Sequence, residues 1–274
     1  MLSNRKNSKE NVLDMNVLNK NILENQFKRK LKNKELQLGL WVNAVSPIMA
    51  EITATAGYDW LLFDGEHGPN TTADLLYQLM AIQPYKSHGI VRPLEGTRAN
   101  IKQVLDLGAQ TLLIPMVESA EQAEEIYKSM CYAPKGYRGV GASVARSGRW
   151  NRLPDYMEYC ENELCLLVQV ESRKGIENLD EIASVEGVDG VFFGPADLST
   201  DMGYLGDASV PEVMEVMERS VKRVCELGKA AGTLAVNVDV AKKFIEWGAT
   251  FVAVGSDVLL YNEAVDNRLA QFRK

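Results

Sequence analysis

The chain has 274 residues, of which 46% are hydrophobic and 24% are charged, as in an ordinary globular protein. This length fits one large domain, and the net charge of −7 argues against a nucleic-acid-binding protein. No apolar run approaches the ~20 residues that span a bilayer, and no secretory signal is recognisable. The four cysteines form no Cys-x-x-Cys pair, so we expect reduced thiols and a cytoplasmic protein.

Residues 1–36 form a basic extension, with nine Lys/Arg against four Asp/Glu. Apolar residues from Leu13 to Phe27 recur at loose helical spacing. The extension is either an amphipathic helix that touches a membrane surface or a partner, or a solvated tail or capping helix, which its composition favours. We expect it to be helical or disordered and to precede a single folded domain over residues 37–274.

From residue 37 onward, short apolar runs alternate with longer segments of helical period. The runs predict eight strands, at Leu38–Val42, Trp60–Phe63, Gly89–Arg92, Thr111–Pro115, Leu164–Glu171, Gly190–Phe193, Ala231–Ala235 and Phe251–Gly255. The periodic segments predict helices at Ile48–Ala56, Thr72–Ala81, Thr97–Asp106, Ala120–Met130, Ile176–Ala183, Glu212–Leu227, Val240–Trp247 and Leu259–Phe272.

Several predicted helices end in a short glycine turn, namely at Ala56–Asp59, Leu107–Ala109, Glu186–Asp189 and Trp247–Ala249. Glycine just past a helix end supplies a left-handed backbone position. The repeat of helix, glycine and buried strand predicts βα units with a parallel sheet, and eight units predict a (β/α)8 TIM barrel. An open doubly wound sheet is the alternative. It is disfavoured because no glycine-rich dinucleotide or phosphate-binding motif follows the first strand.

Residues 131–163 interrupt this alternation and predict a long loop after the fourth strand. The loop carries Arg138, Arg146, Arg149, Trp150 and Arg152. Long loops in compact domains are usually functional or disordered. Its basic residues predict either an anion-binding site or a subunit contact.

Polar side chains follow the carboxyl ends of the predicted strands, and in a barrel these ends converge on the face that carries the active site. They are Asp64, Glu66 and His67 after the second strand, Arg92 at the third, Pro115 and Glu118 at the fourth, Gln169 and Glu171 at the fifth, Asp197 after the sixth, and Ser256 and Asp257 at the eighth.

The carboxylates Glu171 and Asp197 follow neighbouring strands and suit a hard divalent ion such as Mg2+ or Mn2+. Each could instead cap the helix that follows it, but their convergence favours a metal site. The backbone N–H groups of Ala196 and Asp197 begin a predicted helix, a position suited to a substrate carboxylate.

His67 follows two acids in a glycine-flanked turn, which suits a general base. His88 lies in a loop before a strand, so we expect it on the surface at the opposite face of the barrel. Arg92 suits a clamp for a carboxylate or an enolate, or an ion pair with one of the acids. Asp106 either orients a histidine or is an exposed helix residue.

No predicted strand contains a lysine, which a Schiff-base aldolase needs within the barrel; Lys174 lies in a turn and Lys229 at the wrong end. Metal-assisted enolate chemistry is therefore favoured over iminium chemistry.

With these residues in place, the chain from Leu38 to Phe272 resembles the HpcH/HpaI family of class II, metal-dependent pyruvate aldolases. The matching segments are Phe63–Asn70, Val91–Pro93, Ile101–Gly108, Gln110–Val117, Arg138–Gly141, Arg149–Arg152, Gln169–Glu171 and Gly194–Ser199. Residues 1–36 lie outside the resemblance.

The resemblance implies that Glu171 and Asp197 bind the metal ion, as Mg2+, Mn2+ or Co2+. It implies that His67 is the acid/base, acting through metal-bound water, and that Asp106 orients it. Around the substrate it implies further roles: Arg92 holds the pyruvyl oxygen, Gln169 lines the pyruvate site, the amides of Ala196 and Asp197 bind the carboxylate, and Asp64 and Glu66 support these groups from behind.

The activity implied is reversible cleavage of a 4-hydroxy-2-oxo acid to pyruvate and an aldehyde. The expected substrate is of the 4-hydroxy-2-oxoheptane-1,7-dioate type, giving succinate semialdehyde, as in aromatic compound catabolism. The alternatives are a 2-keto-3-deoxy sugar acid of the rhamnonate or glucarate type, an acyl-CoA carbon–carbon lyase of the citrate lyase β-like group, and a non-enzymatic barrel. The resemblance also implies a homo-oligomer, a hexamer, that exchanges the C-terminal helix.

Overall fold

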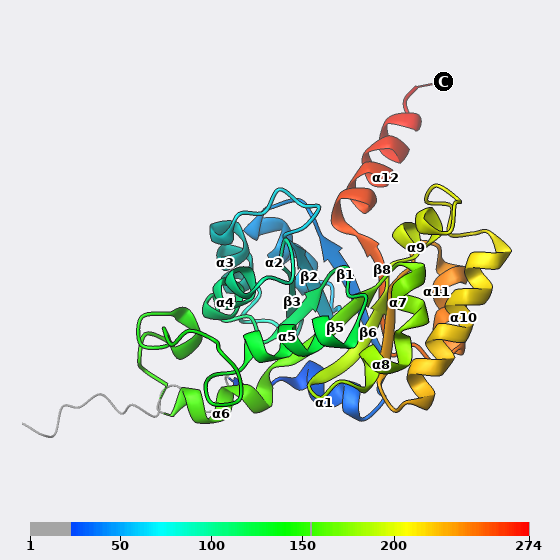
Figure 1. The fold of residues 1–274 in the computed structure, drawn as a ribbon. Coiled ribbons are helices and arrows are strands. Elements are labelled where there is room, and N and C mark those ends of the chain that lie inside the picture. Colours follow the sequence, from blue (N-terminus) through cyan, green and yellow to red (C-terminus); the bar gives the residue numbers. More distant parts are fainter. Residues whose placement is uncertain (1–22, 154, 274) are drawn as a thin grey trace, which may run out of the picture.

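The computed structural model describes residues 23–153 and 155–273, so most of the predicted extension lies outside it. Eight parallel strands form a closed barrel in chain order, with β8 paired to β1 (Figure 1). The strands are β1 Gln37–Val42, β2 Trp60–Asp64, β3 His88–Arg92, β4 Thr111–Ile114, β5 Cys165–Val170, β6 Val188–Phe193, β7 Ala230–Leu234 and β8 Phe251–Ser256. This confirms the predicted (β/α)8 barrel and excludes the open sheet.

The helices that surround the barrel follow the predicted alternation. They are α2 Pro47–Thr55, α3 Thr72–Ala81, α4 Arg98–Asp106, α5 Ala120–Met130, α7 Arg173–Glu177, α8 Leu179–Ser184, α10 Pro211–Glu226, α11 Val238–Glu246 and α12 Asp257–Ala270. The helix predicted over Ile176–Ala183 is the pair α7 and α8. The break is at Asn178, whose side chain donates to the main-chain oxygen of Glu118 (2.8 Å).

Three further helices are short: α1 Gln26–Lys32, α6 Tyr156–Glu163 and α9 Pro195–Asp201. Helix α1 lies in the extension expected to be helical or disordered, and α9 begins at the helix start expected at Ala196 and Asp197, whereas α6 was not predicted. Each spans about two turns, too short for a clear helical period. Helix α6, with the short 3₁₀ helix η3 Arg146–Gly148, lies within the segment expected to be a loop. The glycine turns are confirmed, since Gly57 and Gly248 adopt φ of +93° and +110°, where glycine alone is unstrained.

Large side chains fill the interior of the barrel. Trp60, Phe192 and Phe251 are almost fully buried. The ring of Phe251 contacts both Trp60 and Phe192. Phe27 and Leu31 of α1 join this cluster from the N-terminal end of the barrel. Part of the predicted extension is therefore a plug that completes the core rather than a solvated tail.

His88 begins β3 and packs under this plug. Its ring stacks on Phe27, with ring centroids 5.4 Å apart, and its Nε2 lies 2.7 Å from Oγ1 of Thr111. Burial lowers the pKa of His88 to about 4. The residue lies at the expected end of the barrel, but it is half-buried rather than fully on the surface, because α1 packs against it.

Helix α12 stands away from the barrel (Figure 1). Apart from Asp257 all its residues are exposed, and they include Leu259, Leu260, Tyr261 and Leu269. No helix within the described ranges is long and apolar enough to cross a membrane. The four cysteines are free, as expected.

Candidate active site

Arg92, the last residue of β3, lies at the centre of the polar cluster on the carboxyl edge of the barrel. Its Nε and Nη2 donate to the two carboxylate oxygens of Asp64 (2.9 and 2.8 Å), and its Nη1 lies 2.6 Å from Oε2 of Glu66. The guanidinium also stacks over the ring of Trp41 at 4.3 Å. Arg92 and Asp64 are buried, and a bidentate ion pair of this kind fixes the guanidinium in one orientation.

Asp64 also shapes the turn after β2. Its Oδ1 accepts from the backbone amides of Glu66 (3.0 Å) and His67 (3.3 Å), and its Oδ2 from the side chain of Asn43 (3.0 Å). Burial opposes ionisation of Asp64, but Arg92 outweighs it and holds the pKa of that carboxyl below its ordinary value. The charged Asp64 thereby positions the backbone of Glu66 and His67.

Glu171 lies across the barrel mouth from this pair and is 3% exposed. Its Oε1 accepts from the amide of Met116 (3.0 Å), and its Oε2 accepts from the side-chain amide of Gln169. The carbonyl oxygen of that amide lies 3.5 Å from Nη1 of Arg92. The pKa of Glu171 is raised to about 7, mainly by burial and also by the carboxylates of Asp197 and Glu66.

Asp197 lies in the exposed first turn of α9, beside Ala196, close enough for its charge to raise the pKa values of both Glu171 and Glu66. Gly194 precedes this turn, and a Cβ there would lie 2.2 Å from Oε2 of Glu171. The lack of a side chain at Gly194 therefore lets the carboxylate of Glu171 take this position.

A divalent metal ion fits this donor set. The carboxylates of Asp197 and Glu66 lie close enough to Glu171 to raise its pKa, and carboxylates crowded in this way are stabilised by a hard cation. Within residues 23–153 and 155–273, no three Asp, Glu, His or Cys side chains form a metal cluster. Glu171 and Asp197 remain the predicted ligands of such an ion.

His67 lies at the rim of this cluster. Its side chain is 68% exposed, and Nε2 is 3.8 Å from Oε2 of Glu66. Asp106 does not lie beside it: this residue ends α4 and pairs with Nη2 of Arg138 (3.1 Å). The expectation that Asp106 orients His67 is thus not met within one chain. In a βα unit the helix runs back against its strand, so its last residue lies at the opposite end of the barrel.

The sequence analysis missed Trp41 and Asn43, although both come from the end of β1. Asn43 links Asp64 to the start of α12, because its backbone amide donates to Oδ1 of Asp257 (2.8 Å). Applying the strand-end rule to the first strand would have found Asn43. No sequence pattern points to the amide of Met116, which faces Glu171 because its backbone adopts φ of +54°.

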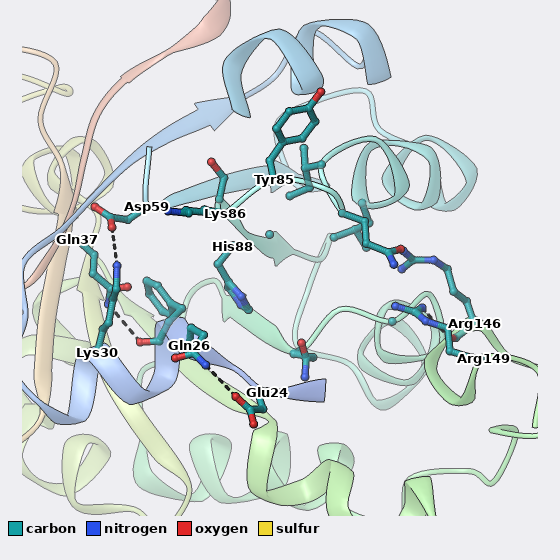
Figure 2. Close-up of a pocket in the computed structure, with 18 residues that line it drawn as sticks. Glu24, Gln26, Lys30, Gln37, Asp59, Tyr85, Lys86, His88, Arg146 and Arg149 are labelled. Carbon is teal, nitrogen blue, oxygen red and sulfur yellow. Dashed lines mark hydrogen bonds and ion pairs between the residues drawn. The ribbon is translucent and has the colours of Figure 1, made fainter. Parts of the chain in front are cut away.

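The arginine-rich loop lies far from this cluster. Arg146 and Arg149 line a pocket at the N-terminal end of the barrel, together with His88 and Gln110 (Figure 2). Both expected roles of this loop, an anion-binding site and a subunit contact, remain predictions.

Known proteins match nearly the whole chain. Residues 37–264 match the HpcH/HpaI aldolase/citrate lyase family. The chain is 56% identical to 2-keto-3-deoxy-L-rhamnonate aldolase from Escherichia coli O1:K1 / APEC, over 92% of this chain and 94% of that protein. The Escherichia coli K12 / DH10B aldolase of the same name matches to the same extent.

Among solved structures, a HpcH/HpaI aldolase/citrate lyase family protein from Burkholderia cenocepacia J2315 is 33% identical, with a TM-score of 0.88 over 91% of this chain and 100% of that one. A HpcH/HpaI aldolase from Desulfitobacterium hafniense DCB-2 is 28% identical, with a TM-score of 0.83 over 90% and 96%. The family consists of carbon–carbon lyases. The chain therefore belongs to the HpcH/HpaI aldolase/citrate lyase family and is a carbon–carbon lyase.

Proposed function

We propose that this class II aldolase cleaves a 2-keto-3-deoxy sugar acid of the rhamnonate type to pyruvate and a small hydroxyaldehyde. The observation that carries this proposal is the 56% identity, over nearly the whole chain, to aldolases named for that substrate. The relatives support this alternative better than the heptanedioate substrate that the sequence analysis put first. They likewise point to sugar-acid rather than aromatic catabolism.

The position of the basic loop supports the same choice. A semialdehyde with a terminal carboxylate needs a cation at the far side of the bond that breaks. Arg146 and Arg149 lie at the other end of the barrel, and Arg92 is already paired with Asp64 and Glu66. A neutral hydroxyaldehyde needs no such cation.

In the proposed reaction, Arg92 and Gln169 hold the 2-oxo oxygen of the substrate. The first-turn amides of Ala196 and Asp197, which have no partner within the helix, bind its carboxylate. Glu171 and Asp197 would hold a divalent ion, as Mg2+ or Mn2+, which supplies a positive charge that stabilises an enolate.

His67 removes the proton of the 4-hydroxyl group. The new C4 carbonyl forms as the C3–C4 bond breaks, and the electron pair of that bond passes into the enolate of pyruvate. Arg92 stabilises the charge on the enolate oxygen. A proton delivered to C3 then completes pyruvate, and the remaining fragment leaves as the aldehyde.

The test is an aldehyde panel with pyruvate and Mn2+ or Mg2+, read by product detection in the synthetic direction. We expect a higher kcat/KM for short hydroxyaldehydes than for succinate semialdehyde, and loss of turnover on addition of EDTA. Preference for the semialdehyde would overturn the substrate assignment. Full activity in EDTA, or labelling of a lysine by pyruvate and borohydride, would overturn the mechanism.

We also propose that the protein is a homo-oligomer, a hexamer by family resemblance, assembled through α12. This 14-residue helix exposes Leu259, Leu260, Tyr261 and Leu269, and an isolated helix of this length is marginal in water. We therefore expect the apolar side chains of α12 to be buried against the surface of another copy of the chain. Light scattering should give a mass several times 30.4 kDa, and a monomeric mass would refute this proposal.

A further inference from the structure

A pocket lies at the N-terminal end of the barrel, opposite the proposed active site. It is a cavity of about 550 Å³. Its walls come from α1, the starts of β1 and β3, and the loop after α5. Figure 2 shows Lys30 on one side, Arg146 and Arg149 on the other, and His88 between them. None of the proposed catalytic residues lines it.

Arg146 is a buried cation without a counter-charge. It is 8% exposed, and its guanidinium donates to the main-chain oxygen of Leu107 and to Oε1 of Gln83, each at 2.8 Å. Both partners are neutral, and no carboxylate in the described part of the chain pairs with it. The other buried arginines differ, since Arg92 and Arg138 each pair with an aspartate.

Arg149 adds a second unpaired charge beside the first. It is half-buried, and its Nη1 donates to the main-chain oxygen of Arg146 (3.0 Å). Burial, and then the charge of Arg149, lowers the pKa of Arg146 to about 10, so both groups stay charged at neutral pH. Like charges held together away from water are unfavourable unless an anion lies between them.

The acidic side chains around the pocket do not supply that anion. Glu24 pairs with Arg29 (2.6 Å), and Asp59 pairs with Lys30 (2.8 Å).

The backbone beside Arg146 also leaves space for its guanidinium group. A Cβ at Gly108 would lie 2.9 Å from Nη1 of Arg146, so glycine leaves room for it.

We propose that this pocket binds a small anion through a carboxylate or phosphate group held by Arg146 and Arg149. Planar guanidinium groups bind both kinds of group through paired hydrogen bonds. The cavity is large enough for a metabolite rather than a single ion. Because the pocket lies at the far end of the barrel, its ligand binds outside the proposed active site.

The test uses inorganic phosphate and citrate as probes, with the metal-free full-length protein in EDTA at constant ionic strength. Isothermal titration and thermal unfolding compare the wild type with Arg149→Ala and Arg149→Gln. Arg152→Ala is the matched control, because Arg152 is an exposed arginine of the same loop. We expect at least one probe to bind the wild type and Arg152→Ala equally, and both Arg149 variants to bind it at least tenfold more weakly.

Equal binding by the wild type and the Arg149 variants would overturn the proposal, as would no binding of either probe to the wild type. The carboxylate could also belong to a second copy of the chain, and light scattering distinguishes this source. If neither probe binds and Arg149→Ala lowers the oligomeric mass, the arginines form a subunit contact and the pocket is not a metabolite site.

Discussion

His88 should make the stability of this protein depend on pH. The unfolded chain binds a proton at His88 with an ordinary pKa of about 6.5, whereas burial lowers the pKa in the folded protein to about 4. Between these values the unfolded state binds more protons, so acid favours unfolding. The stabilisation is complete above pH 6.5 and is lost as the pH falls towards 4.

The magnitude follows from the size of this difference. Each pKa unit corresponds to about 1.4 kcal/mol, so full protonation of His88 should cost about 3 kcal/mol of unfolding free energy. Phe27 on one face and Thr111 at Nε2 hold the ring in place, and this limits its movement towards the pocket that it lines. Lys30, Lys86 and Asp59 line the same pocket, but burial is the cause identified for the shift.

The assay is urea unfolding at fixed protein concentration from pH 7.5 to pH 4.5, for the wild type and His88→Gln. Glutamine can keep a hydrogen bond to Thr111 but does not titrate. The free-energy difference between the two proteins should shift by about 2–3 kcal/mol over this range. His67→Gln is the control, because its side chain is 68% exposed. An unfolding free-energy difference between the wild type and His88→Gln that stays constant over this pH range would refute the reasoning.

Three further changes test the proposed active site. Arg92→Met should lower the unfolding free energy by about 3–5 kcal/mol, because it leaves the buried carboxylate of Asp64 without its partner. Gly194→Ala should weaken Mn2+ binding by about 10–100-fold in a titration, because the new methyl group displaces Oε2 of Glu171. His67→Gln should lower kcat by about 10²–10⁴-fold with little change in Tm, since it removes a base but no packing.

Matched variants separate these effects from general damage. Arg98→Met removes an exposed arginine and should cost under about 1 kcal/mol; an equal loss in Arg92→Met would contradict a buried ion pair. Gly139→Ala meets only the flexible side chain of Lys102 and should leave Mn2+ binding unchanged. A His67→Gln enzyme with full turnover would remove this residue from the mechanism.

The barrel could be predicted because its signals are local. Each βα unit carries a buried run, a periodic helix and often a glycine turn, and Gly57 and Gly248 do adopt the left-handed conformation. Most of the cluster around Arg92 could then be predicted from the residues at strand ends, because the carboxyl ends of parallel strands converge regardless of the conformation of the loops.

The remainder depends on tertiary packing. Helix α1 spans only seven residues, and nothing in its sequence shows that Phe27 enters the barrel and covers His88. The place of Asp106 has a different reason: the family resemblance implied its role, although the end of the predicted helix at Asp106 already puts it at the opposite end of the barrel from His67 within one chain. The loop arginines could be recognised as functional candidates, but their location at the N-terminal end required the structure.

The hydrogen bonds at the start of α12 connect two properties that are usually treated separately. Asp257 accepts from the amide of Asn43, Asn43 donates to Asp64, and Asp64 holds Arg92. The helix whose apolar surface is free for another copy is thus anchored two residues away from the group proposed to stabilise the enolate. Assembly and turnover should consequently share determinants, so a surface mutation on α12 needs a kinetic measurement as well as a mass.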